Sequence, residues 1–111
     1  MRDHLDELEI SPELVREMMD AGENFVLLDV RNDGEWELAH LEGAIHIPLP
    51  ELESRLDELD PANEVIVYCH VGERSVDACL VLWNAGFRKV RNLTGGIDAW
   101  SELIDPTVPR Y

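Results

Sequence analysis

The stretch that decides the fold is Val65-Ile66-Val67-Tyr68-Cys69-His70-Val71-Gly72-Glu73-Arg74-Ser75. Its first four residues form a β-branched apolar run that predicts a buried strand, and a helical pattern begins where the segment ends. Because the first N–H groups of a helix have no internal partner, they point into the loop that precedes it. Such amides stabilise an anion and therefore favour the thiolate, which is the nucleophilic form of cysteine. The segment thus indicates a nucleophilic Cys69 at the carboxyl end of a strand.

The loop after Cys69 is expected to form an anion cradle from the backbone amides of six residues. These residues are His70, Val71, Gly72, Glu73, Arg74 and Ser75. Gly72 permits a positive φ in the turn, and Ser75 can cap the following helix. Arg74 can orient the loop or contact an anion directly, and His70 can steer a substrate or simply face solvent. A purely structural role for Cys69 stays open here, since free cysteine often behaves as a small buried hydrophobe.

Strand and helix patterns alternate on both sides of this segment. Apolar runs predict strands at 25–30 and 65–68, and short strands are expected at 44–47 and 90–93. Helical patterns are expected at 12–21, 33–38, from Pro50 to Leu59, 75–85 and 96–103. This alternation predicts an α/β domain with a parallel sheet and helices on both faces. The segment 105–111 contains Pro106 and Pro109 and is expected to be irregular. Ligands bind at the carboxyl ends of such strands, so Asp29, Arg31 and Cys69 should share one edge of the sheet.

Four motifs, in order along the chain, resemble those of the rhodanese family. They are Leu28-Asp29-Val30-Arg31, the segment from Glu35-Trp36 to Gly43-Ala44-Ile45-His46-Ile47-Pro48, Cys69-x-x-Gly72-x-Arg74-Ser75, and Leu93-Thr94-Gly95-Gly96-Ile97-Asp98-Ala99-Trp100. The resemblance implies one rhodanese-like domain over residues 1–111, with a core at about 8–101. It also implies a five-stranded, mainly parallel sheet.

The resemblance implies a sulfurtransferase in which Cys69 takes sulfane sulfur from a thiosulfate-like or persulfide donor. The sulfur then passes from the Cys69 persulfide to a thiol or cyanide-like acceptor, which can be a protein thiol. His70 and Glu73 occupy positions that are often basic in members that use thiosulfate, so thiosulfate is disfavoured as the donor. One alternative is a noncatalytic or persulfide-carrying interaction module. Another is a phosphatase or arsenate reductase, whose loops place five residues between Cys and Arg, where this chain has four.

Several residues outside the loop are expected to support the site. By the resemblance, Asp29 and Arg31 brace it from the neighbouring strand. Trp36 is interpreted as a packing anchor, and Gly95 and Gly96 as small residues that let the last helix approach the loop. Cys79 follows a helical apolar spacing and is interpreted as core. The four histidines and two cysteines show no metal-ligand spacing, so neither a metal nor a cofactor is expected.

The charge of the chain limits its partners. The formal net charge is −15, from 24 acidic and 9 basic residues, and Lys89 is the single lysine. This balance argues against nucleic-acid binding, which requires basic patches, and predicts a protein from a halophile, in which salt screens the self-repulsion. No apolar run is long enough for a membrane span. Residues 1–7 lack a signal-peptide pattern, so a cytoplasmic location is expected.

Overall fold

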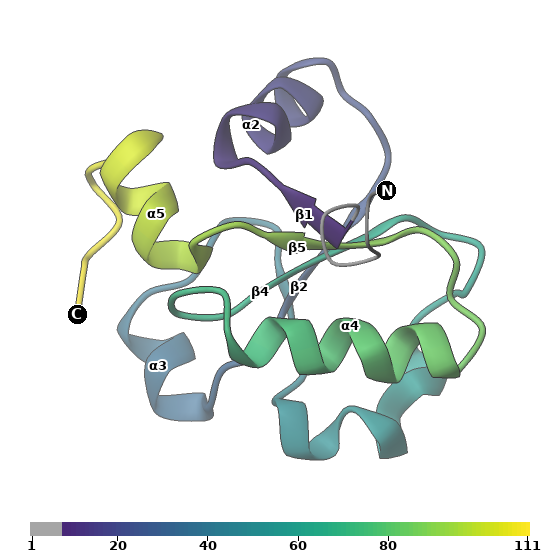
Figure 1. Ribbon diagram of the computed structural model, residues 1–111. Helices are drawn as coiled ribbons and strands as arrows, with labels where there is room; N and C mark the ends of the chain where they lie inside the picture. The colour runs from purple at the N-terminus through teal and green to yellow at the C-terminus, as the bar shows by residue number, and fades with distance from the viewer. Residues whose placement is uncertain (1–7) are drawn as a thin grey trace, which may run out of the picture.

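Five parallel strands form the centre of the molecule in a computed structural model, which describes residues 8–111. The strands are β1 (Glu9–Ile10), β2 (Val26–Asp29), β3 (Ile45–His46), β4 (Val65–Tyr68) and β5 (Val90–Leu93). Their order in the sheet is β1-β5-β4-β2-β3, and every adjacent pair is parallel (Figure 1). The predicted α/β class and five-stranded sheet are confirmed. The fifth strand is β1, whose two residues are too few to produce an alternating pattern. The segment 1–7, with its expected lack of a signal peptide, lies outside the described residues.

Within residues 8–111, three α-helices and two 3₁₀ turns connect the strands, and a fourth α-helix follows β5. The α-helices are α2 (Pro12–Asp20), α3 (Asp33–Leu38), α4 (Arg74–Asn84) and α5 (Gly96–Leu103); the 3₁₀ turns are η1 (Leu49–Glu51) and η2 (Glu53–Glu58). Ser11 caps α2 by accepting a hydrogen bond from the Leu14 amide at 3.1 Å. Asn32 and Glu35 form a capping box at the start of α3.

The helix expected from Pro50 to Leu59 is not an α-helix, and this expectation was wrong. The chain here makes i to i+3 hydrogen bonds, such as Arg55 N to Leu52 O at 3.0 Å, and Arg55 interrupts it with φ −121° and ψ 17°. The kink leaves Leu52 fully buried and Leu59 nearly so. The spacing of these leucines indicates burial against the sheet. It does not distinguish an α-helix from a 3₁₀ helix.

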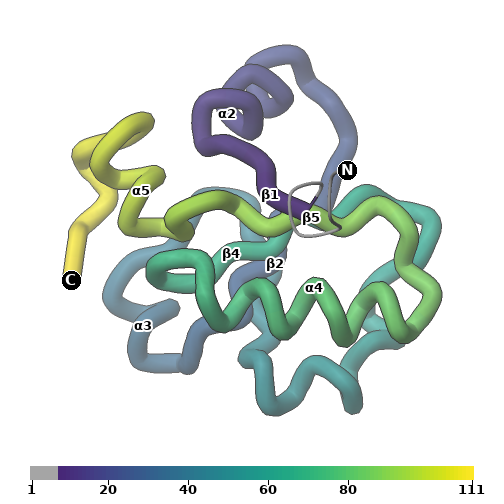
Figure 2. Tube along the Cα trace, in the orientation of Figure 1, coloured from purple at the N-terminus to yellow at the C-terminus, as the bar shows by residue number. Residues whose placement is uncertain are grey.

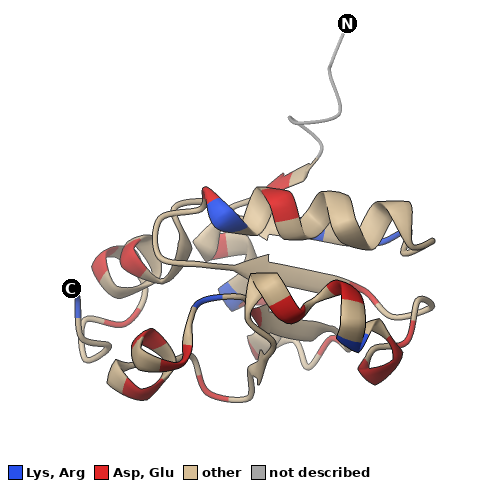
Figure 3. Cartoon of the chain, turned by 90° about the horizontal axis from the view of Figure 1, so that it is seen from below, with Lys and Arg blue, Asp and Glu red and all other residues tan. Residues whose placement is uncertain are grey.

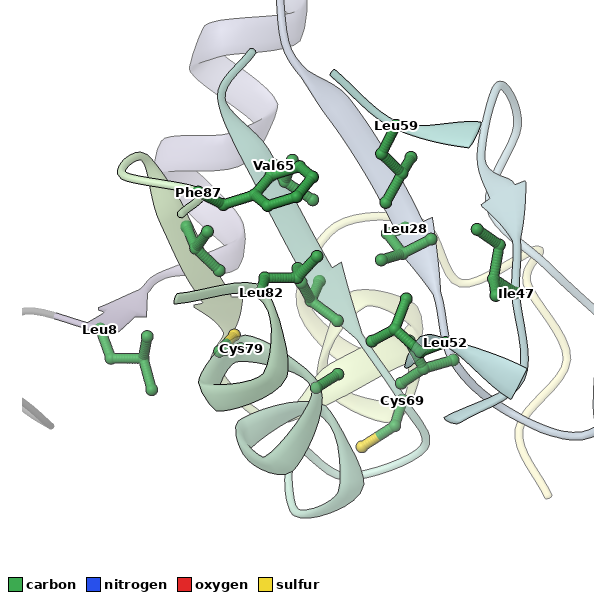
Figure 4. Packing of buried hydrophobic residues seen from close by; sticks show 14 residues of the cluster. Leu8, Leu28, Ile47, Leu52, Leu59, Val65, Cys69, Cys79, Leu82 and Phe87 are labelled. Carbon is green, nitrogen blue, oxygen red and sulfur yellow. The ribbon is translucent and has the colours of Figure 1, made fainter. Parts of the chain in front are cut away.

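The alternation of side chains along β4 divides the core into two layers. Val65, Val67 and Cys69 belong to the cluster beneath α4 and the 3₁₀ turns, whereas Ile66 and Tyr68 belong to the cluster beneath α2 and α5. Figure 4 shows the first cluster, with Cys69 at its edge and Cys79 on α4. A strand that is buried on both faces reads as the continuous apolar run seen in the sequence.

The carboxyl ends of the central strands meet at one edge of the sheet, as predicted. Asp29 on β2 lies in register with Tyr68 on β4, so Cys69 follows directly beside the end of β2. The loop between β4 and α4 projects toward the start of α5 (Figure 2). Figure 1 also shows α3, the first turn of α4 and the carboxyl-terminal segment gathered at this end of the sheet.

Acidic residues are spread over the helices and connecting segments, with few basic ones between them (Figure 3). Within residues 8–111, no helix combines the length and the apolar character that crossing a membrane requires.

Candidate active site

Cys69 lies directly after β4, with its sulfur enclosed by the loop that follows. Its Sγ accepts hydrogen bonds from the backbone amides of Gly72 at 3.2 Å and Ser75 at 3.4 Å. The Ser75 hydroxyl also contacts the sulfur, with an Oγ–Sγ distance of 3.3 Å. Gly72 has φ +95°, the conformation expected of it, and this turns its amide toward the sulfur. Two backbone amides therefore donate to Sγ, and the Ser75 hydroxyl lies in contact with it.

Ser75 does not cap α4, and that expectation was wrong. The helix begins one residue earlier, at Arg74, and Glu73 occupies the cap position without a side-chain hydrogen bond. Ser75 is completely buried in the first turn, and its hydroxyl donates to Asn92 Oδ1 on β5. Asn92 in turn donates to the Gly72 carbonyl at 3.1 Å. Ser75 thus connects the sulfur to β5 and, through Asn92, to the loop. A serine at the cap position of the helix could not make these contacts.

Arg74 forms a bidentate ion pair with Glu35, the first residue of the second motif. The Nη1–Oε1 and Nη2–Oε2 distances are 2.6 and 2.9 Å. The hydrogen bonds from Arg74 lower the pKa of Glu35 to about 2, so the carboxylate is ionised at neutral pH. Within residues 8–111, the side-chain hydrogen bonds of Arg74 go to Glu35 and none to Cys69. Arg74 therefore ties the loop to α3.

Asp29 and Arg31 form a fully buried ion pair behind the loop. Arg31 Nη2 donates to Asp29 Oδ2 at 2.6 Å, and both side chains have zero exposure. Arg31 also donates to the carbonyls of Glu35 and Ala39, so it fixes both ends of α3. Burying two charges is costly unless all their hydrogen bonds are satisfied. Within residues 8–111, every buried side-chain nitrogen and oxygen has a partner.

The segment 105–111 is irregular, as expected, but it reaches the active-site loop. The Tyr111 ring stacks on His70 with 4.1 Å between ring centroids. The Tyr111 hydroxyl donates to Glu35 Oε2 at 2.6 Å and accepts from Arg31 Nη1 at 2.8 Å. One tyrosine thus contacts the loop, α3 and the end of β2.

Trp36 does not contact the sulfur. Its ring lies between His40 and His46, with centroid distances of 3.7 and 4.7 Å and nearly parallel planes. His46 Nε2 is 2.7 Å from the Arg31 carbonyl. Trp36 therefore packs the segment after α3 against the end of β2, which is the packing role expected of it.

Gly95 and Gly96 stand where the last helix meets the loop. The amides of Ile97 and Asp98 donate to the carbonyls of Cys69 and His70 at 2.9 and 3.0 Å. Gly96 has φ +62°, and a Cβ there would overlap the carbonyl oxygens of Cys69 and His70 and lie 2.7 Å from the His70 carbonyl carbon. Only glycine allows this close approach.

Cys79 is separate from this site. It is fully buried in the core cluster on α4, and this burial raises its pKa to about 12. Figure 4 shows the two sulfur atoms apart, with Cys69 beside the loop and Cys79 farther along the helix. The expected core role of Cys79 agrees with its environment.

A cleft of about 380 Å³ opens beside Arg74. Valine, leucine and proline side chains form the apolar part of its wall, and asparagine, carboxylate and arginine side chains form the polar part. The lining residues are Val30, Asn32, Asp33, Pro48, Leu49, Pro50, Glu51 and Arg74. Arg74 is the one residue of the loop 69–75 that lines this cleft.

Three residues of this arrangement were missed by sequence reasoning: Glu35, Asn92 and Tyr111. Glu35 was quoted only as part of a motif, although its carboxylate binds the loop arginine. Asn92 offered a signal, since a polar residue in the expected strand 90–93 requires a hydrogen-bond partner when it is buried. Tyr111 follows two prolines in an irregular segment and offered no signal.

Comparisons with known proteins show the family to which this fold belongs. A model of the rhodanese-like domain family matches residues 11–103. The chain is 41% identical over 93 residues to YrkF of Bacillus subtilis, named as a sulfur carrier protein, a match covering 84% of this chain and 50% of YrkF. It is 32% identical over 100 residues to a sulfurtransferase of Allochromatium vinosum, covering 90% and 94% of the two chains.

Among solved structures, the human single-domain sulfurtransferase TSTD1 shares the fold. Its TM-score is 0.77 at 27% identity, and the alignment covers 86% of this chain and 96% of the human chain. The chain spans half the length of YrkF, and a smaller share of several other curated relatives. The family model, the four motifs and the shared fold together show that this chain belongs to the rhodanese-like domain family.

Proposed function

We propose that this protein is a sulfurtransferase that carries sulfane sulfur as a persulfide on Cys69. The observation that supports this most directly is the contact of Sγ with the amides of Gly72 and Ser75 and with the Ser75 hydroxyl. The two amides stabilise the thiolate before the reaction and the charged terminal sulfur of the persulfide after it. The names of the relatives, a sulfur carrier and a sulfurtransferase, support the same chemistry.

The first half-reaction loads Cys69. The thiolate attacks the outer sulfur of a donor, and a new bond forms between that sulfur and Sγ. The donor's own sulfur–sulfur bond breaks, and the remainder leaves with the electron pair, as a thiolate from an organic persulfide or as sulfite from thiosulfate. The second half-reaction unloads Cys69, when an acceptor nucleophile attacks the terminal sulfur and the Cys69 thiolate leaves. The two steps balance without an external oxidant or reductant, and they predict ping-pong kinetics.

Access to the sulfur is part of this proposal. Cys69 is only 1% exposed, so the loop 70–73 must open for the donor sulfur to reach Sγ. The outer part of this loop is well placed to move, because Val71 is 47% exposed and Glu73 is exposed.

The proposal is tested by mass spectrometry after incubation with an organic persulfide. Wild type is expected to gain the mass of one sulfur atom on the peptide that contains Cys69, and Cys69→Ser is expected to gain none while keeping its fold. Cys79→Ala is the matched control, since it removes the other thiol and should still acquire the adduct. Turnover at the wild-type rate in Cys69→Ser would refute the proposal. If no donor loads Cys69, the interaction-module alternative replaces it.

The acceptor is proposed to be a thiol, and a protein thiol fits the name of YrkF as a sulfur carrier. Cyanide serves as the acceptor in an assay. A cytoplasmic location and a halophilic source remain predictions from the sequence. Because Arg74 pairs with Glu35, the geometry gives no support to the phosphatase alternative, in which an arginine must face the phosphate.

A further inference from the structure

We infer that Tyr111 is a positioning residue that holds the active-site loop closed over Cys69 by stacking on His70. It thereby controls how often the sulfur is accessible to a donor or an acceptor. This inference deepens the access step of the proposed function and rests on it. Tyr111 lies outside residues 11–103, which the family model matches, so its contacts are not part of the pattern that identifies the family.

The closed loop leaves almost no surface of Cys69 to a reagent. Cys69 is 1% exposed, and the Gly72 amide lies 3.2 Å from its Sγ. By contrast, Val71 is 47% exposed in the outer part of the loop, so its side chain does little to hold the loop against the fold. The balance between closed and open loop therefore depends on contacts at the base of the loop, where His70 lies.

Tyr111 restrains His70 by a face-to-face contact of the two rings. Their centroids are 4.1 Å apart, and their planes differ by 11°. The His70 carbonyl also accepts a hydrogen bond from the Asp98 amide at 3.0 Å, so both the backbone and the side chain of this residue are held. When the loop opens from its first residue, the imidazole must leave the tyrosine ring. The stacking energy is therefore part of the free energy that opening requires.

The hydroxyl of Tyr111 attaches the ring to a rigid part of the fold. It accepts a hydrogen bond from Arg31 Nη1 at 2.8 Å and donates to Glu35 Oε2 at 2.6 Å. Arg31 has zero exposure and pairs with Asp29, so this anchor does not move with the loop. Tyr111 itself is 40% exposed, so these specific contacts, and not burial in the core, fix its position. One end of the tyrosine is thus fixed, and its face holds the loop.

Alkylation of Cys69 by iodoacetamide measures access to the sulfur without a sulfur donor. The rate constant is followed by mass spectrometry of the peptide that contains Cys69, over a range of pH. When opening and closing are fast compared with alkylation, this constant is proportional to the open population. Tyr111→Ala is expected to raise its limiting value at high pH about threefold to tenfold, since tenfold corresponds to ~1.4 kcal/mol. Tyr111→Phe keeps the stacking ring, so its limiting value should be at most about half that of Tyr111→Ala.

The pH profile separates access from ionisation of the thiol. A higher limiting rate constant reports a loop that is open more often, whereas a shift of the pH midpoint alone reports a change in thiolate stability. A midpoint shift with an unchanged limiting value in Tyr111→Ala would overturn the inference, and so would equal rates in Tyr111→Ala and Tyr111→Phe. Tyr111→Ala is expected to fold, because Arg31 Nη1 keeps the Glu35 carbonyl as an acceptor at 3.3 Å.

A double-mutant cycle assigns the effect to the contact between the two rings. If the stack holds the loop, His70→Ala combined with Tyr111→Ala should alkylate no faster than the faster single variant, whereas effects that multiply would overturn the inference. Leu103→Ala is the matched control, since it truncates a side chain on the neighbouring helix α5 that is 56% exposed. It should alkylate at the wild-type rate, and a gain equal to that of Tyr111→Ala would also overturn the inference.

The same samples distinguish failure of this inference from failure of the proposed function. Wild type is incubated in parallel with the persulfide of 2-mercaptoethanol, and the adduct on Cys69 is measured by mass spectrometry. If Cys69 is alkylated as expected in all variants but takes no sulfur, the proposed function has failed while the restraint by Tyr111 stands. If Cys69 takes sulfur and Tyr111→Ala leaves the limiting alkylation rate unchanged, the inference alone has failed.

Discussion

Two cysteines of this chain show how local contacts decide the chemistry of a residue. Cys79 lies in an apolar cluster, and burial keeps it protonated by raising its pKa to about 12. Cys69 is almost equally buried, yet its sulfur receives two amide hydrogen bonds and contacts a hydroxyl. Burial alone therefore does not distinguish the two thiols, and the hydrogen-bond donors around the Cys69 sulfur do.

Ser75→Ala tests the importance of these donors at the scale of one residue. The Ser75 hydroxyl donates its one proton to Asn92 Oδ1, and Asn92 donates to the Gly72 carbonyl, so the substitution should loosen the loop whose amides contact Sγ. A hydrogen bond to a charged group contributes about 1.5–3 kcal/mol, so weakening one amide contact is expected to lower the loading rate of Cys69 by roughly tenfold to a hundredfold. The substitution also removes the hydroxyl that donates to the buried Asn92 Oδ1, so the free energy of unfolding should fall by about 1–3 kcal/mol. Loading is followed by mass spectrometry and stability by urea unfolding.

Ser101→Ala separates the effect on the loading rate from the effect on stability. Ser101 is also buried, and its hydroxyl donates to the Val108 carbonyl at 2.5 Å, away from the loop. This variant should lose stability by a comparable amount while loading Cys69 at the wild-type rate. If Ser75→Ala also loads at the wild-type rate, the serine has no role in the reaction.

At the scale of elements, the site depends on the close approach of α5 to the loop, which Gly96 allows. Gly96→Ala combines an unfavourable positive φ with overlap against the carbonyls of Cys69 and His70. Gly22→Ala is the control, because Gly22 has a similar φ of +70° but a Cβ there would meet nothing within 4 Å. The control should lose about 1–2 kcal/mol of stability from backbone strain. Gly96→Ala should lose several kcal/mol by core overpacking and also load Cys69 more slowly. Equal losses in urea unfolding would show that the close contact is unimportant.

Elements whose pattern lies within a few consecutive residues could be predicted from the sequence. The apolar runs indicated β2 and β4, and the order of apolar run, cysteine, glycine and helix located the candidate nucleophile. The hydrogen-bond type of the turns after Pro48 could not be read from three leucines, because both kinds of helix can bury them. The partners Glu35 and Tyr111 were also beyond reach. Arg74 and Glu35 are 39 residues apart, and Tyr111 is 76 residues from Glu35. Only the packing of the whole domain brings such pairs together.

At the scale of the whole molecule, excess negative charge opposes the compact state. The formal net charge is −15 on 111 residues, and acidic positions are spread around the fold (Figure 3). The Debye length falls from about 10 Å at 0.1 M salt to about 3 Å at 1 M, so molar salt screens repulsion between neighbouring carboxylates. The surface ion pairs weaken at the same time, but each exposed pair contributes at most about 1 kcal/mol. Relief of repulsion is therefore expected to dominate.

Thermal unfolding in increasing KCl tests this expectation. We expect the Tm to rise by about 10 °C between 0.1 and 2 M, which corresponds to roughly 2 kcal/mol for a domain of this size. The double variant Glu13→Gln and Glu17→Gln removes two exposed charges from α2, where repulsion and not packing is affected. It should be more stable than wild type at low salt and gain less from KCl. A Tm that is constant across this range, or a larger gain in the double variant, would show that the acidic surface is not an adaptation to salt.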